Sequence, residues 1–179
     1  MQMNLPNKLT IMRVLLIPVF LLVLFLAPEP TNRYIATIIF IVASLTDFLD
    51  GHIARKYNLV TNFGKFMDPL ADKLLVMSAL VSLVAMENLP AWVVIVILAR
   101  EFAITGFRTL AAEANIIMAA SWWGKIKTTT QMIMTILLLL QLPFAAMDTI
   151  ETIFVVLAVF FTIVSGVDYI VKNKQVLMG

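Results

Sequence analysis

The stretch TDFLDGHIARKYNLVTNFGKFMDPLADK, residues 46–73, is unusually rich in charged residues for a chain that is otherwise mostly apolar. It lies between long apolar runs, yet the 26 residues from Asp47 to Asp72 include four aspartates, two glycines and Arg55. A carboxylate is costly to bury in hydrocarbon, so such residues usually face a cavity, an ion or a partner. The stretch therefore predicts a polar site built between helices.

The composition is that of an integral membrane protein. Of the 179 residues, 61% are hydrophobic and only 13% are charged, whereas about 25% of a soluble domain is charged. The mean hydropathy is +0.98. A formal charge of +2 without a basic run argues against nucleic acid as a partner. The absence of cysteine excludes disulfides, thiolate catalysis and cysteine-ligated zinc.

Runs of about 20 apolar residues, separated by polar or proline-containing breaks, predict six membrane spans. The expected spans are 9–27, 33–54, 66–86, 90–111, 125–143 and 149–171. The connections are short, so we expect an all-α bundle of six transmembrane helices that forms a single membrane domain over residues 1–179.

The basic residues predict the topology. With six spans, twelve of the thirteen lysines and arginines fall on the side of the two termini, and Arg33 alone falls on the other side. Cytoplasmic segments are enriched in Lys and Arg. We therefore expect both termini to be cytoplasmic.

The four aspartates are expected to converge. Asp47 and Asp50 are one helical turn apart near the cytoplasmic end of the second span, and Asp68 and Asp72 are one turn apart near the start of the third. Four carboxylates at one level repel each other unless cations compensate them. An all-oxygen ligand set suits Mg²⁺ or Mn²⁺ better than zinc.

Small residues accompany these acids. Gly51, Ala54 and Gly64 predict a groove beside the metal ligands that a ligand can approach closely. Arg55 at its edge can contact a phosphate with its fork of donors. Together these features point to a nucleotide-activated lipid whose diphosphate is held by metal.

The complete pattern D-x2-D-G-x2-A-R-x8-G-x3-D-x3-D from Asp47 to Asp72 resembles the signature of the CDP-alcohol phosphatidyltransferase family. Eight fixed residues at fixed spacing make this a specific motif. The resemblance implies a homodimer in the lipid bilayer that uses Mg²⁺ or Mn²⁺, two ions per subunit, to displace CMP from a CDP-linked lipid by an alcohol.

Four flanking segments are similar to family members whose acceptor is glycerol 3-phosphate, namely residues 4–13, 68–75, 99–108 and 124–132. Four cations in two of them are expected to bind the phosphate of the acceptor: Arg100, Arg108, Lys125 and Lys127. The resemblance thus implies transfer of the phosphatidyl group from CDP-diacylglycerol to sn-glycerol 3-phosphate in phospholipid biosynthesis. It also implies a multi-pass protein of the bacterial cytoplasmic membrane with its active site on the cytoplasmic side.

The same resemblance suggests a role for each motif residue. The metals would be held by Asp47, Asp50 and Asp68. Asp72 would be the general base for the acceptor hydroxyl and a further metal ligand. The nucleotide groove would be lined by Gly51, Ala54, Arg55 and Gly64, with Asn7, Thr10 and Arg13 as further candidates.

Several alternatives stay open at this point. The four flanking cations are also explained as membrane-interface anchors, and Glu101 and Glu113 as their partners. Asp168 is expected to cap or pair near the end of the sixth span. A cation transporter would also use intramembrane carboxylates. Within the family, inositol phosphate or phosphatidylglycerol could replace glycerol 3-phosphate as the acceptor.

Overall fold

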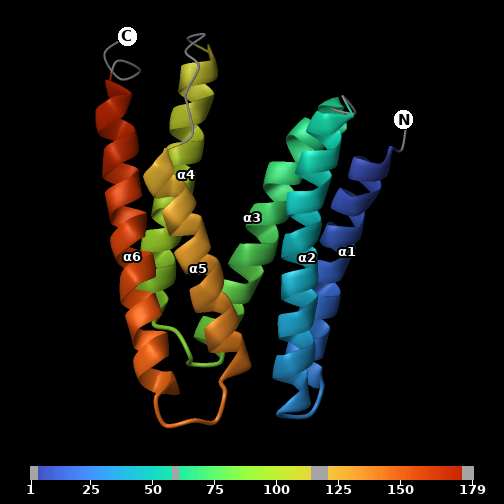
Figure 1. Cartoon of the computed structure of the whole chain (residues 1–179), viewed down its shortest axis with the longest axis vertical. Helices are drawn as coiled ribbons and strands as arrows, with labels where there is room; N and C mark the ends of the chain where they lie inside the picture. Colours follow the sequence, from blue (N-terminus) through green and yellow to red (C-terminus); the bar gives the residue numbers. More distant parts are fainter. Residues whose placement is uncertain (1–3, 58–60, 114–120, 175–179) are drawn as a thin grey trace. The chain divides into compact units, whose positions relative to one another are not determined.

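The protein is α-helical in the computed structural model, which describes residues 4–57, 61–113 and 121–174 apart from the side chains of residues 48–56, 62 and 65. Its described helices are α1 (Leu5–Leu26), α2 (Thr31–Lys56), α3 (Asn62–Ala85), α4 (Ala91–Glu113), α5 (Trp122–Leu140) and α6 (Met147–Lys172) (Figure 1). The described residues contain no β-strand, so the all-α prediction is confirmed.

The helix ends follow local capping groups and not the limits of the apolar runs. α1 begins at Leu5, ahead of the expected residue 9, because the side chain of Asn4 accepts a hydrogen bond from the backbone N–H of Asn7. In the same way, α3 begins after Thr61, whose hydroxyl accepts from the N–H of Gly64. α5 ends at Leu140, because Gln141 adopts a positive φ of 41°.

Residues 1–86, together with residues 139–141, form one compact unit. Within it, α1 packs along both α2 and α3. The rings of Phe20 and Phe40 meet across the α1–α2 contact, with centroids 6.3 Å apart. Fully buried alanines on α2 and α3, including Ala36, Ala43 and Ala79, let the helices approach closely.

Residues 87–138 and 142–179 form the second compact unit. Here α4 packs against α6, and Ile104, Phe107 and Tyr169 form a buried cluster between these two helices. α5 joins α6 through the stacked rings of Trp123 and Phe161, whose centroids are 6.1 Å apart.

Two of the described helices, α1 and α6, are long and apolar enough to cross a membrane. Their most apolar windows have mean hydropathies of 2.7 and 2.4, and only 28% and 22% of these windows are buried within the protein. Large apolar side chains such as Leu22 on α1 and Phe160 on α6 are exposed, as lipid-facing residues are. The finding covers these two helices, so the prediction of six spans stays a prediction.

The packing of Phe40 yields a first testable expectation. Replacing this fully buried ring by Ala leaves a cavity against Phe20. We expect a loss of unfolding free energy of roughly 3–5 kcal/mol, or a drop in Tm of about 10 °C. Thermal unfolding of the purified protein in detergent measures this. Leu45→Ala on the same helix is the control, because Leu45 is exposed, and an equal effect of both changes would contradict the packing described.

Candidate active site

A stripe of buried polar side chains runs along the N-terminal half of α1. Asn7, Thr10 and Arg13 follow one another at intervals of three residues, so they share one face of the helix. Their exposed fractions are 2%, 0% and 0%. Polar groups buried this deeply have to find partners inside the protein. We call these three residues the α1 polar stripe.

The first partner of the α1 polar stripe is on α2. The Nη1 atom of Arg13 lies 2.7 Å from Oδ1 of Asp47, and its Nε donates to the backbone carbonyl of Ala43 at 3.3 Å. The Asp47 side chain is 37% exposed, whereas the arginine is fully buried. A buried guanidinium is strongly destabilising without an anion, so this ion pair ties α1 to the first signature aspartate.

The second partner is on α3. The hydroxyl of Thr10 donates to Oδ1 of Asp68 at 2.5 Å. At the start of α3, the Thr61 hydroxyl donates to Oδ1 of Asn7 at 2.9 Å. A Cβ atom on Gly64 would lie 3.3 Å from both Asn7 Oδ1 and Asp68 Oδ2. Gly64 therefore gives these two side chains the room they occupy.

The α1 polar stripe thus brings together signature residues from two helices. Asp47 on α2 is near enough to Asp68 on α3 for the two carboxylates to repel each other. Asp72 is half-buried and lies one turn further along α3 than Asp68, as the i, i+4 spacing predicts. Asp50, Gly51, Ala54 and Arg55 lie in the helical backbone of α2, but their side chains are outside the described part of the structure.

The donor set fits a hard divalent cation. Among the described residues, no three His, Cys, Asp or Glu side chains form a group with metal-binding geometry; the side chain of Asp50, one of the four expected ligands, is not among those described. The donors that are described are carboxylate oxygens, which Mg²⁺ and Mn²⁺ prefer. The repulsion between Asp47 and Asp68 is of the kind that a bound cation relieves.

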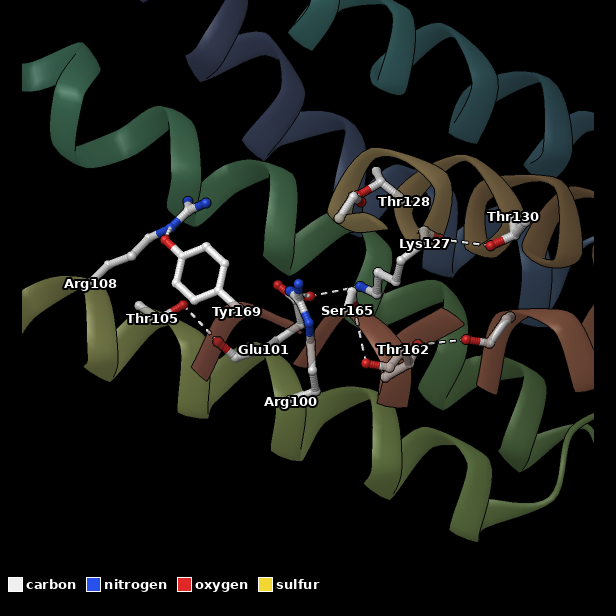
Figure 2. A network of polar contacts seen from close by, with 12 residues as sticks. Arg100, Glu101, Thr105, Arg108, Lys127, Thr128, Thr130, Thr162, Ser165 and Tyr169 are labelled. Carbon is white, nitrogen blue, oxygen red and sulfur yellow. Dashed lines mark hydrogen bonds and ion pairs between the residues drawn. The ribbon is translucent and has the colours of Figure 1, made fainter. Parts of the chain in front are cut away.

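The four predicted phosphate-binding cations belong to the second unit, and two of them share one carboxylate. Oε1 of Glu101 accepts from Nη1 of Arg100 at 2.9 Å and from Nζ of Lys127 at 2.6 Å (Figure 2). Lys127 is buried in this contact. The expectation that Glu101 pairs with these cations is confirmed. Gly166 on α6 makes room for Arg100, because a Cβ there would lie 3.3 Å from Cγ of the arginine.

The other two cations are exposed and lie against aromatic rings. Nε of Arg108 donates to the hydroxyl of Tyr169 at 2.8 Å, and its guanidinium carbon lies 5.4 Å from the ring centroid. Nζ of Lys125 lies 5.5 Å from the ring centroid of Trp122. Both side chains therefore keep a charged end at the surface, where an anionic ligand can reach it.

Asp168 is paired near the end of α6, as expected. Its Oδ2 accepts from the hydroxyl of Ser121 at 2.6 Å, and its Oδ1 lies 2.8 Å from Nζ of Lys172. The hydrogen bond to Asp168 holds Ser121, the residue that precedes α5, against α6. Neither Tyr169 nor Ser121 belongs to a sequence motif, so the sequence alone did not indicate a role for them. The α1 polar stripe, in contrast, could be recognised from the three-residue spacing of its members.

Comparison of the sequence with known proteins identifies the family of this chain. The sequence model of the CDP-alcohol phosphatidyltransferase family matches residues 3–164. The chain belongs to this family, and the predicted resemblance is confirmed.

Individual relatives match nearly the whole length of the chain. A Bacillus subtilis protein named CDP-diacylglycerol–glycerol-3-phosphate 3-phosphatidyltransferase is 48% identical, with 97% of each chain covered. A Rickettsia felis protein of the same name is 40% identical, with 96% of each chain covered. A Mycobacterium tuberculosis protein named probable phosphatidylglycerophosphate synthase is 40% identical over 98% of this chain and 84% of its own.

The crowding at Gly64 can be tested by adding one methyl group. Gly64→Ala is expected to displace the Asp68 carboxylate from its bond with Thr10 and to lower phosphatidyl transfer on the order of tenfold. The matched control is Gly106→Ala in α4, where a Cβ meets nothing within 4 Å. That change should leave activity intact and slightly raise Tm. Equal activities of the two variants would show that Asp68 does not depend on this space.

Proposed function

We propose that this protein transfers the phosphatidyl group of CDP-diacylglycerol to sn-glycerol 3-phosphate, producing phosphatidylglycerophosphate and CMP. One observation carries the proposal. Relatives that carry this activity in their names match the chain over nearly its full length, and the complete eight-residue signature lies within the matched region. The contacts of the α1 polar stripe with Asp47 and Asp68 support the assignment of these two aspartates to the site.

The signature aspartates would hold the cofactor. Asp47, Asp50, Asp68 and Asp72 would bind Mg²⁺ or Mn²⁺, with two ions per subunit. When bound, the ions supply charge neutralisation at the diphosphate and at the departing CMP. Arg13 and Thr10 contribute by orienting the carboxylates of Asp47 and Asp68.

Asp72 is proposed as the general base. Its carboxylate accepts the proton of the C1 hydroxyl of glycerol 3-phosphate as that oxygen attacks the β-phosphorus of CDP-diacylglycerol. The new bond joins the acceptor oxygen to the β-phosphorus, and the bond from this phosphorus to the bridging oxygen breaks. That oxygen leaves with CMP. In-line displacement of this kind depends mainly on positioning and on charge stabilisation.

Two groups of residues would bind the substrates. The nucleotide groove would be lined by Gly51, Ala54, Arg55 and Gly64, and Asn7 and Thr10 border it through their contacts with α3. Arg108 and Lys125, whose charged ends are exposed, would contact the acceptor phosphate directly. Arg100 and Lys127 would support that pocket from their shared contact with Glu101.

The proposed setting is the bacterial cytoplasmic membrane. All six helices would cross the bilayer as a single membrane domain, with both termini and the active site on the cytoplasmic side. The exposed apolar surfaces of α1 and α6 and the distribution of the basic residues support this topology. The active form would be a homodimer, as the family resemblance implies.

The direct test follows CMP release by the purified protein in detergent with CDP-diacylglycerol and Mg²⁺. Parallel reactions contain glycerol 3-phosphate, inositol phosphate, phosphatidylglycerol, serine or no acceptor. Release is expected with glycerol 3-phosphate alone. Asp72→Asn should lower the rate about a hundredfold or more, because the proton acceptor is lost.

Other outcomes of this assay are equally informative. Release with a different acceptor would contradict the proposed substrate and leave the family chemistry in place. No release with any acceptor would contradict the transferase assignment, and ion transport by reconstituted protein would then be measured.

The cofactor proposal has its own test. Chelation with EDTA is expected to abolish CMP release, and Mg²⁺ or Mn²⁺ in excess of the chelator should restore it. Asp47→Asn should raise the metal concentration needed for half-maximal rate, since one ligand charge is removed. A rate that chelation does not change would contradict a metal-dependent mechanism.

A further inference from the structure

Arg108 has a fixed orientation although its side chain is exposed. Its Nε donates to the Tyr169 hydroxyl at 2.8 Å, and the guanidinium carbon lies 5.4 Å from the centre of the same ring (Figure 2). Arginine carries five N–H donors in a planar fork. A bond made through Nε leaves the four donors of the two terminal nitrogens for another ligand.

Tyr169 is itself held firmly by the fold. The residue is 2% exposed and belongs to the buried cluster with Ile104 and Phe107. Its ring meets that of Phe107 edge-on, with centroids 6.3 Å apart. Directly after the end of α6, the side-chain amide of Asn173 donates to the Tyr169 carbonyl at 2.8 Å. The hydroxyl that accepts from Arg108 therefore has a position determined by the α4–α6 packing.

Two further cations of this unit, Arg100 and Lys127, have a different kind of partner. Arg100 and Lys127 both contact Oε1 of Glu101, so a carboxylate already compensates part of their charge. Arg108 contacts a neutral phenol and an aromatic face, which orient the guanidinium without neutralising it. A guanidinium oriented in this way can donate two parallel hydrogen bonds to two oxygens of a phosphate.

We propose that Tyr169 is a positioning residue that orients Arg108 to bind the phosphate of the acceptor. This inference rests on the proposed function, because it assigns a residue to the recognition of glycerol 3-phosphate. Tyr169 is not one of the eight residues of the family signature. Tyr169 also lies beyond residue 164, where the match to the family's sequence model ends.

The test compares Tyr169→Phe with the wild-type enzyme. The substitution keeps the ring against Phe107 and removes only the hydroxyl. We expect the KM for glycerol 3-phosphate to rise about tenfold, as befits the loss of one hydrogen bond to a charged group. The KM for CDP-diacylglycerol and the Tm should change little. Tyr34→Phe on α2 is the matched control and should leave all three values unchanged.

A double-mutant cycle separates positioning from direct contact. If Tyr169 acts through Arg108, then Tyr169→Phe should have no further effect on the KM in an Arg108→Met background. The same increase in both backgrounds would overturn the inference, and so would an unchanged KM in Tyr169→Phe alone. A wild-type enzyme that releases no CMP with glycerol 3-phosphate would instead contradict the proposed function, before any variant is made.

Discussion

A guanidinium buried inside a helical bundle requires an anion, and Arg13 meets this requirement with Asp47 on α2. The pairing fixes the rotation of α1 about its axis. Because Thr10 lies on the same face, that rotation also sets the bond from its hydroxyl to Asp68 on α3. One apolar helix thereby positions carboxylates from both halves of the signature. The geometry of the candidate metal site depends on this contact.

The second unit handles its charges in another way. Glu101 pairs with both Arg100 and Lys127 within the protein, whereas Arg108 is oriented by a tyrosine and keeps its charge at the surface. The cations therefore differ in role. Arg100 and Lys127 stabilise the contact between α4 and α5 through Glu101, and Arg108 can bind an external anion. α6 serves both arrangements through Gly166 and Tyr169. The proposed pocket for a phosphorylated acceptor rests on this arrangement.

Much of the fold was predictable because apolar runs and polar breaks determine where membrane helices form. The helix starts at Leu5 and Asn62 were missed by four residues, since capping by Asn4 and Thr61 extends each helix beyond its apolar run. The approach of Asp47 to Asp68 was predicted from the spacing of the four aspartates. The contacts of Asn7 and Thr10 with α3 were not, because spacing identifies a shared face and not the helix that the face meets. Tyr169 gave no signal, since its role arises only when α4 packs on α6.

The central claim is that Arg13 and Asp47 are energetically coupled and that this coupling holds the site together. A double-mutant cycle on the free energy of unfolding, measured in detergent with a chelator present, tests it with Arg13→Met, Asp47→Asn and the combined variant. We predict a favourable coupling on the order of 2 kcal/mol, because Asp47→Asn removes the carboxylate charge that lies against the fully buried guanidinium of Arg13. Additive effects of the two substitutions would contradict the account.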